Sequence, residues 1–303
     1  MKIQNHSYKC LIASGCLILI ALVMTLLGLG FRLGLDFSGG CLIRLDMGQA
    51  FEQADVAMAL KNQGIAAYSL AVSGENGQIL QIRVPELEDA EEISALQAGL
   101  EAAFAENYPD LNAPATAAGL IGPAADITFL LNAFICLLFA IAFILVYFII
   151  RFDIRSGIVA VVSLLHDWLI VASFMVILRG VLRVNASFAA VMLVVTACSV
   201  YNLYILFNRI RENRKLPACR NLSRGEIVTL SIGQNCGRTV STLLITLLLF
   251  GTLSVIGAEA IREISLPIII GAIASAYSTN MISGYLWALL RGRAKTKKKA
   301  KKA

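Results

Sequence analysis

Six apolar runs dominate the sequence, and each of them is long enough to cross a lipid bilayer. They occupy residues 10–30, 127–150, 157–178, 187–207, 239–257 and 264–290. A helix rises about 1.5 Å per residue, so about 20 apolar residues span a hydrocarbon core of roughly 30 Å. The longest interval between two runs is 31–126. The sequence therefore predicts a membrane α-helical bundle of six transmembrane helices, with a small domain inserted between helix one and helix two.

Composition supports lipid as the solvent of this chain. Hydrophobic residues make up 58% of the 303 residues, and a water-soluble domain of that length would need an improbably large core to bury them. The first run is too long for the apolar part of a signal peptide, and no small-residue cleavage site follows it. We therefore expect residues 1–30 to form a retained N-terminus and first transmembrane helix.

Lysine and arginine predict the orientation of the six helices. They gather before run one, after runs two and four, and in a basic tail at 291–303, while the connections between runs three and four and between runs five and six carry only Arg179, Arg183 and Arg262. Because such loops stay in the cytoplasm, both termini are predicted to be cytoplasmic and the 31–126 domain to be extracytoplasmic. The net charge of +6 comes largely from the tail. We expect the tail to contact anionic membrane lipid, and a nucleic-acid partner is disfavoured.

The inserted domain has a readable order of elements. Alternating or turn-bounded segments predict strands at 41–47, 67–72, 79–84 and 115–121, and helical spacing predicts helices at 50–62 and 88–105. The order β-α-β-β-α-β is that of a ferredoxin-like α+β domain. The sequence of this domain shows no catalytic cluster. Over the whole chain, the seven cysteines have no paired spacing for zinc or redox chemistry. We expect no enzymatic activity, no metal and no cofactor.

A glycine-rich signature follows the first helix. Residues 34–40 read GLDFSGG, in which Gly34, Asp36, Gly39 and Gly40 permit turns and close backbone approach. In this layout the segment resembles the Gly-Leu-Asp-Phe-(Thr/Ser)-Gly-Gly signature of the SecD/SecF family of protein-export membrane proteins, which are accessory subunits of the bacterial Sec translocase.

Further segments resemble the family's motifs in the same order along the chain. They are IGP at 121–123, YFIIRF at 147–152, LHD at 165–167, FNRIREN at 207–213, GRT at 237–239 and the Ile-Gly…Tyr-Ser segment at 270–278. The resemblance implies a SecF-like subunit of the bacterial cytoplasmic membrane that acts with SecD, the SecYEG translocon and a translocating polypeptide. It also implies the helical architecture of the proton-driven RND superfamily.

The fourth helix departs from the family at the position of its proton-carrying carboxylate. The family pattern Gly-Tyr-Ser-x-Asn-Asp corresponds to residues 197–202, so Asn202 takes the place of the final Asp, and Asn208 replaces a later Asp. An amide cannot take up and release a proton near neutral pH, whereas a carboxylate with a raised pKa can. The subunit's own proton-relay carboxylate is therefore predicted to be lost.

His166 and Asp167 are the ionisable residues left within the spans when tyrosine and cysteine are set aside. A charge at mid-membrane costs about 2.5–3.5 kcal/mol on insertion scales, which makes both residues functional candidates. Two interpretations stay open for Asp167: a proton relay, or a packing group that hydrogen-bonds neighbouring helices. Their adjacency places the two side chains about 100° apart around the helix, so His166 need not share a partner with Asp167.

Polar stripes on helices four, five and six predict a common polar interior. They are Thr196–Ser199–Asn202, Gln234/Asn235–Arg238–Ser241/Thr242 and Gly271–Ser275–Ser278. Small and polar faces are the ones that packed membrane helices turn toward one another, so Asn202 is expected to meet Arg238 there. The alternative for Arg238 is that its side chain extends to a lipid phosphate.

The sequence thus divides into residues 1–30, the α+β domain 31–126, the five-helix bundle 127–290 and the tail 291–303. Two other functions remain as alternatives to protein export. One is an RND-type half-transporter for small solutes or lipids, disfavoured because a half bundle needs a second half. The other is a purely structural subunit, which Asn202 leaves open.

Overall fold

The chain forms two compact units. The computed structural model describes residues 3–49, 51, 53–65, 68–73, 78–84, 90–105, 117–121, 127–256 and 259–290. One unit combines Met1–Arg32 with Leu131–Ala303, and the other is Leu33–Leu130. The tail 291–303 and the glycine-proline pair at 122–123 lie outside the described residues, so the predictions made for them stay predictions.

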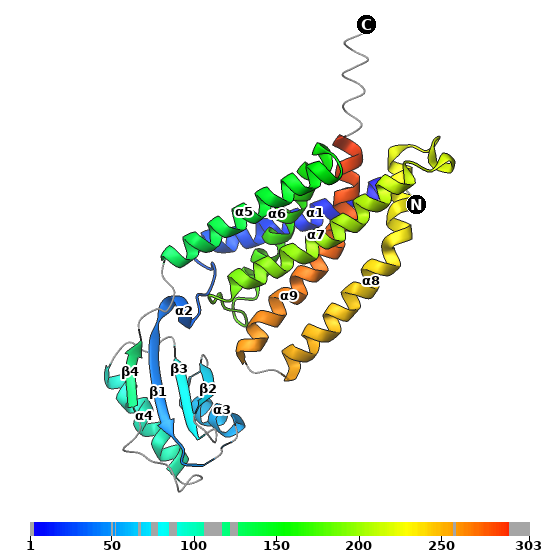
Figure 1. Cartoon of the computed structure of the whole chain (residues 1–303). Coiled ribbons are helices and arrows are strands. Elements are labelled where there is room, and N and C mark those ends of the chain that lie inside the picture. Colours follow the sequence, from blue (N-terminus) through cyan, green and yellow to red (C-terminus); the bar gives the residue numbers. More distant parts are fainter. Residues whose placement is uncertain are drawn as a thin grey trace. The chain divides into compact units, whose positions relative to one another are not determined.

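Six long helices build the first unit (Figure 1). They are α1 (Ile3–Leu26), α5 (Ile127–Arg151), α6 (Ile154–Ile177), α7 (Phe188–Asn213), α8 (Arg224–Ile256) and α9 (Glu259–Ser278), and α9 continues through the π-helical turn Thr279–Ser283. Each contains a stretch that is long and apolar enough to cross a membrane. The described residues thus contain the six spans that the sequence predicts.

Three of these helices form the centre of the bundle. The most apolar windows of the spans containing α6, α7 and α9 are 50%, 44% and 56% buried, against 11% or less in α1, α5 and α8. α9 packs against α6, α7 and α8. Close approach of α7 and α9 depends on Gly271, since a Cβ built there would lie 2.2 Å from a Val195 methyl group. The outer helices present their apolar side chains outward, as helices solvated by lipid do.

α8 is longer than the apolar run at 239–257 from which its span is predicted. It is one continuous helix of 33 residues, Arg224–Ile256. Its start is a capping box: Ser223 N donates to Glu226 Oε2 at 2.6 Å, and Glu226 N donates to Ser223 Oγ at 3.3 Å. No proline lies between residues 224 and 256. The backbone hydrogen-bond ladder therefore continues through the polar segment without a break.

The second unit is a sheet with two main helices. Its elements are the short α2 (Leu35–Ser38), β1 (Gly40–Asp46), α3 (Gln53–Asn62), β2 (Ser69–Ser73), β3 (Ile79–Val84), α4 (Ala90–Ala105) and β4 (Ala117–Ile121). The four strands lie in the order β2-β3-β1-β4, with every neighbouring pair antiparallel. In this register Cys41 lies opposite both Val84 and Leu120.

One face of the sheet carries the core of this unit. Cys41, Ile43 and Leu45 alternate along β1 and are buried, while Arg44 between them is exposed. Buried residues of α3 and α4 complete the cluster at helical spacing, and they are Val56, Leu60, Ile93, Leu96, Leu100 and Phe104. The alternation of strands and helices follows the order that the sequence predicts.

Candidate functional site: a buried polar layer between α6, α7 and α9

Asp167 lies in the middle of α6 and is fully buried. Its Oδ2 accepts a hydrogen bond from Ser199 Oγ of α7 at 2.6 Å. Its Oδ1 lies 3.3 Å from Nδ1 of His166, so the two adjacent residues share a contact despite their angular separation on the helix. His166 Nε2 is buried and has no partner among the described residues. The carboxylate is thus held from two sides in the interior of the bundle.

The polar layer extends from Asp167 along α7 and α9. Asn202, one helical turn from Ser199, donates from Nδ2 to Ser275 Oγ at 2.8 Å. Ser163 and Ser283 join α6 to the end of α9 with their hydroxyl oxygens 2.7 Å apart. Side-chain hydrogen bonds therefore link the three central helices, and they satisfy groups whose burial would otherwise cost free energy.

The predicted meeting of Asn202 with Arg238 does not occur. Asn202 lines a cavity of about 200 Å³ together with Thr239 and Thr242 of α8. Arg238 lines a different cavity, of about 460 Å³, together with Asn208 of α7. Consecutive residues of a helix point about 100° apart, so Thr239 occupies the position facing Asn202 while Arg238 is turned toward the end of α7.

The larger of these cavities contains a charged network. Glu212 accepts from Asn208 Nδ2 at 2.7 Å and from Arg209 Nη1 at 3.0 Å, and Arg209 Nε donates to Gln234 Oε1 at 2.7 Å. Asn208, at the second position where the family pattern has a carboxylate, is thus an amide donor to a carboxylate one turn away. Two arginines face one glutamate, so the cavity is net positive.

Several residues of the layer were not singled out from the sequence. Ser163 and Ser283 are 120 positions apart, and Trp168 Nε1 donates to Thr196 Oγ1 at 2.8 Å between α6 and α7. Single serines and threonines within apolar helices give little signal, because each can also bond its own backbone one turn earlier, as Thr196 does with Met192 O.

The glycine-rich signature at residues 34–40 determines the backbone conformation at the start of the second unit. Gly39 and Gly40 have φ values of 68° and 148°, which residues with a Cβ atom rarely adopt. Phe37 N donates to Gly34 O at 3.1 Å, and Asp36 lies in the first turn of α2. The glycines therefore make the turn from α2 into β1. Among the described residues, no three histidine, cysteine, aspartate or glutamate side chains are grouped closely enough to hold a metal.

The sequence is similar to a family of protein-export membrane proteins. The family described as protein export membrane protein SecD/SecF, C-terminal, matches residues 100–293. The protein translocase subunit SecF of Alicyclobacillus acidocaldarius is 29% identical over 271 residues, which cover 88% of this chain and 86% of that protein. SecF of Endomicrobium trichonymphae is 28% identical over 299 residues, covering 98% and 93%.

Longer relatives combine the names SecD and SecF. The translocase subunit SecDF of Bacillus subtilis is 26% identical over 275 residues, covering 90% of this chain and 36% of that protein. Among solved structures, a crystal structure of SecDF in the super-membrane-facing form aligns with a TM-score of 0.79 at 25% identity, covering 99% of this chain and 39% of that chain. A second, of SecDF as a translocon-associated membrane protein of the genus Thermus, aligns with a TM-score of 0.66 at 26% identity, covering 96% and 39%. The chain thus spans about two fifths of the SecDF structures.

Proposed function

The chain belongs to the SecD/SecF family of protein export membrane proteins, and we propose that it acts as the SecF-type accessory subunit of a Sec protein translocase. The observation that carries this proposal is the match to proteins named SecF over nearly their whole length, 86% in one and 93% in another. The half-transporter for small solutes or lipids is not favoured, because the relatives named here carry translocase names.

A SecD half is the proposed partner within the membrane. This chain aligns with 36–39% of the length of the SecDF relatives, and the rest of their length is enough for a second, SecD-like half. Outer helices α5 and α8 have only 6% of their most apolar windows buried, so they offer surface for such a half or for lipid. The SecYEG channel and the translocating polypeptide are the further partners of the proposal.

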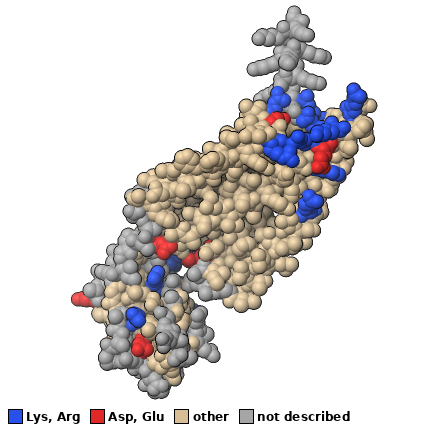
Figure 2. All heavy atoms as spheres, in the orientation of Figure 1, with Lys and Arg blue, Asp and Glu red and all other residues tan. Residues whose placement is uncertain are grey.

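The proposed site of action is the bacterial cytoplasmic membrane. Lys and Arg gather at the end of the bundle where α7 ends and α8 begins (Figure 2), and this end is assigned to the cytoplasm. Both termini are then cytoplasmic, and the β1–β4 unit is an extracytoplasmic, ferredoxin-like domain. The subunit is proposed to catalyse no reaction and to need no cofactor.

Proton coupling is proposed to lie with the SecD half. Asn202 stands where the family's carboxylate is expected, and its amide donates to the buried Ser275. That hydrogen bond joins α7 to α9, and neither the amide nor the hydroxyl that forms it takes up or releases a proton near neutral pH. We propose that this subunit contributes a polar layer of hydrogen bonds between α6, α7 and α9, and that proton uptake and release occur in the SecD half.

Export of a precursor protein into inverted membrane vesicles tests the proposed function. Vesicles that contain SecD and this chain should translocate more precursor than vesicles with SecD alone, and SecD should co-purify with the tagged chain from mild detergent. Unchanged export together with chain-dependent efflux of a small dye or lipid would instead support the half-transporter.

A further inference from the structure

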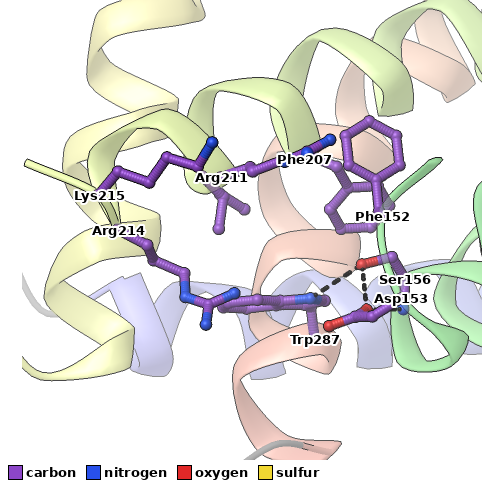
Figure 3. A pocket seen from close by; sticks show the side chains of 9 residues that line it. Phe152, Asp153, Ser156, Phe207, Arg211, Arg214, Lys215 and Trp287 are labelled. Atoms are coloured by element: carbon purple, nitrogen blue, oxygen red, sulfur yellow. Dashed lines mark hydrogen bonds between the residues drawn. The ribbon is translucent and has the colours of Figure 1, made fainter.

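A basic cavity lies at the end of the bundle where α6 begins and where α7 and α9 end. It has a volume of about 270 Å³. It is lined by Arg211 of α7 and by Arg214 and Lys215 just after the end of α7, together with Phe152, Phe207 and Trp287. The close view shows Arg211 and Lys215 on one side of this space, while the Arg214 side chain reaches across to lie beside Trp287 (Figure 3). We call it the basic cavity below.

The cationic side chains that line the basic cavity outnumber its acidic ones. Among the described residues, no carboxylate forms a salt bridge with Arg211, Arg214 or Lys215. The acid that lines the cavity is Asp153, which caps α6: its Oδ1 accepts from Ser156 N at 2.8 Å and from Ser156 Oγ at 2.6 Å. Three cations thus face one carboxylate that is already hydrogen-bonded, and the cavity attracts an anion.

The cationic groups are held in place by contacts that leave donors available. Arg211 donates from Nη1 to Arg151 O at 2.9 Å, which fixes its side chain across the end of α5. The Arg214 guanidinium lies 5.9 Å from the centroid of the Trp287 ring, within the range of a cation–π contact. Trp287 itself donates from Nε1 to Ser156 Oγ at 3.1 Å. Arg214 and Lys215 are exposed at the mouth.

We propose that the basic cavity binds the phosphate of an anionic phospholipid headgroup. It lies where the apolar helices end, which is the level of the headgroups, and basic pockets between transmembrane helices suit such lipids. Phe152 is half-buried and gives the lining an apolar part, suited to the glycerol and upper acyl chain. Phe207 and Trp287 are each 2% exposed, so they offer no free ring face for the base stacking that single-stranded nucleic acid uses.

Native mass spectrometry of the full chain in detergent micelles tests this inference. Phosphatidylglycerol and phosphatidylcholine with acyl chains of the same length are titrated separately. The protein should retain one molecule of phosphatidylglycerol in preference to phosphatidylcholine. The double substitution Arg214→Gln with Lys215→Gln should weaken that binding by roughly tenfold or more, since each cation near a headgroup contributes measurably to affinity. The charge-retaining pair Arg214→Lys with Lys215→Arg should keep most of it.

The matched control is Arg220→Gln, which removes an exposed arginine near the same end of the bundle but outside the cavity lining. It should leave the preference for phosphatidylglycerol unchanged, and thermal unfolding of all variants checks that they are folded. Equal retention of both lipids, or equal binding by the double variant and the control, would overturn the proposal. So would displacement of the lipid by a short RNA oligonucleotide, or retention of inorganic phosphate rather than lipid when both are present at equal concentration, since either result would identify a different ligand.

Discussion

Asp167 keeps a carboxyl group in the centre of a membrane bundle, and its surroundings indicate what the group does there. Both of its oxygens are engaged, one by Ser199 and one by His166, and the side chain has no exposed surface. Breaking one partner of a buried hydrogen bond leaves the other unsatisfied, at a cost of about 1–3 kcal/mol. We therefore favour the packing interpretation, in which Asp167 joins α6 to α7.

Two substitutions at Asp167 separate packing from proton transfer. Asp167→Asn keeps an oxygen that accepts from Ser199, so the complex should assemble, and the uncoupler-sensitive part of translocation should persist. Asp167→Leu removes both acceptors and should lower the unfolding temperature, because the Ser199 hydroxyl is then buried without its partner. The free energy of unfolding should fall by about 1–3 kcal/mol. The measurements are thermal unfolding in detergent and translocation into inverted vesicles with and without an uncoupler.

The same assay identifies the position that would carry a proton. Asn202→Leu should weaken the tie to Ser275 without changing the response to the uncoupler, since the amide it removes does not titrate. If Asp167→Asn abolished the uncoupler-sensitive component in an assembled complex, Asp167 would be a relay and our interpretation would be wrong. Loss of that component in assembled Asn202→Leu would equally contradict the role proposed for Asn202.

At the scale of elements, the close contact between α7 and α9 is where the packing of the bundle can be tested most directly. A Cβ at Gly271 would approach two methyl groups and the Cβ of Val195 to 2.2–3.1 Å, and Val195 is buried with 1% exposure. A buried β-branched side chain has little freedom to move aside. Gly271 therefore sets the distance between the two helices that carry Asn202 and Ser275.

Gly271→Ala should destabilise the bundle by about 1–3 kcal/mol, the usual cost of adding a methyl group to a well-packed interior. The measurement is the unfolding temperature of the purified protein in detergent. Gly251→Ala on α8 is the control, because a Cβ there meets nothing within 4 Å. Equal unfolding temperatures for the two variants would show that α7 and α9 do not pack as closely as the structure has them.

The elements themselves could largely be predicted from the sequence, whereas their connections could not. Hydropathy located six spans because each apolar run matches the thickness of a bilayer. Hydropathy alone marks only residues 239–257 of α8, since the polar residues before Arg238 interrupt the apolar run without breaking the backbone ladder. The polar stripes correctly indicated inward faces at Ser199 and Ser275, but spacing along one helix could not predict that Asn202 bonds Ser275 rather than Arg238.

At the scale of the whole molecule, charge is distributed unequally along the membrane unit. Arg209, Arg211, Arg214 and Lys215 follow one another at the end of α7, while the connection between α6 and α7 carries only Arg179 and Arg183. This asymmetry is the basis of the proposed orientation, because basic loops resist transfer across the membrane. It is also a property that can be tested without knowing the partners.

Cysteine labelling tests the orientation on a background from which the native cysteines have been removed. Lys61→Cys, exposed on α3 of the β1–β4 unit, should react with a membrane-impermeant maleimide in intact spheroplasts. Arg220→Cys, exposed in the connection between α7 and α8, should react only after permeabilisation, because the basic end of the bundle is predicted to face the cytoplasm. The reverse pattern would invert the orientation, and it would place the β1–β4 unit on the side of the membrane where an exported chain has not yet crossed.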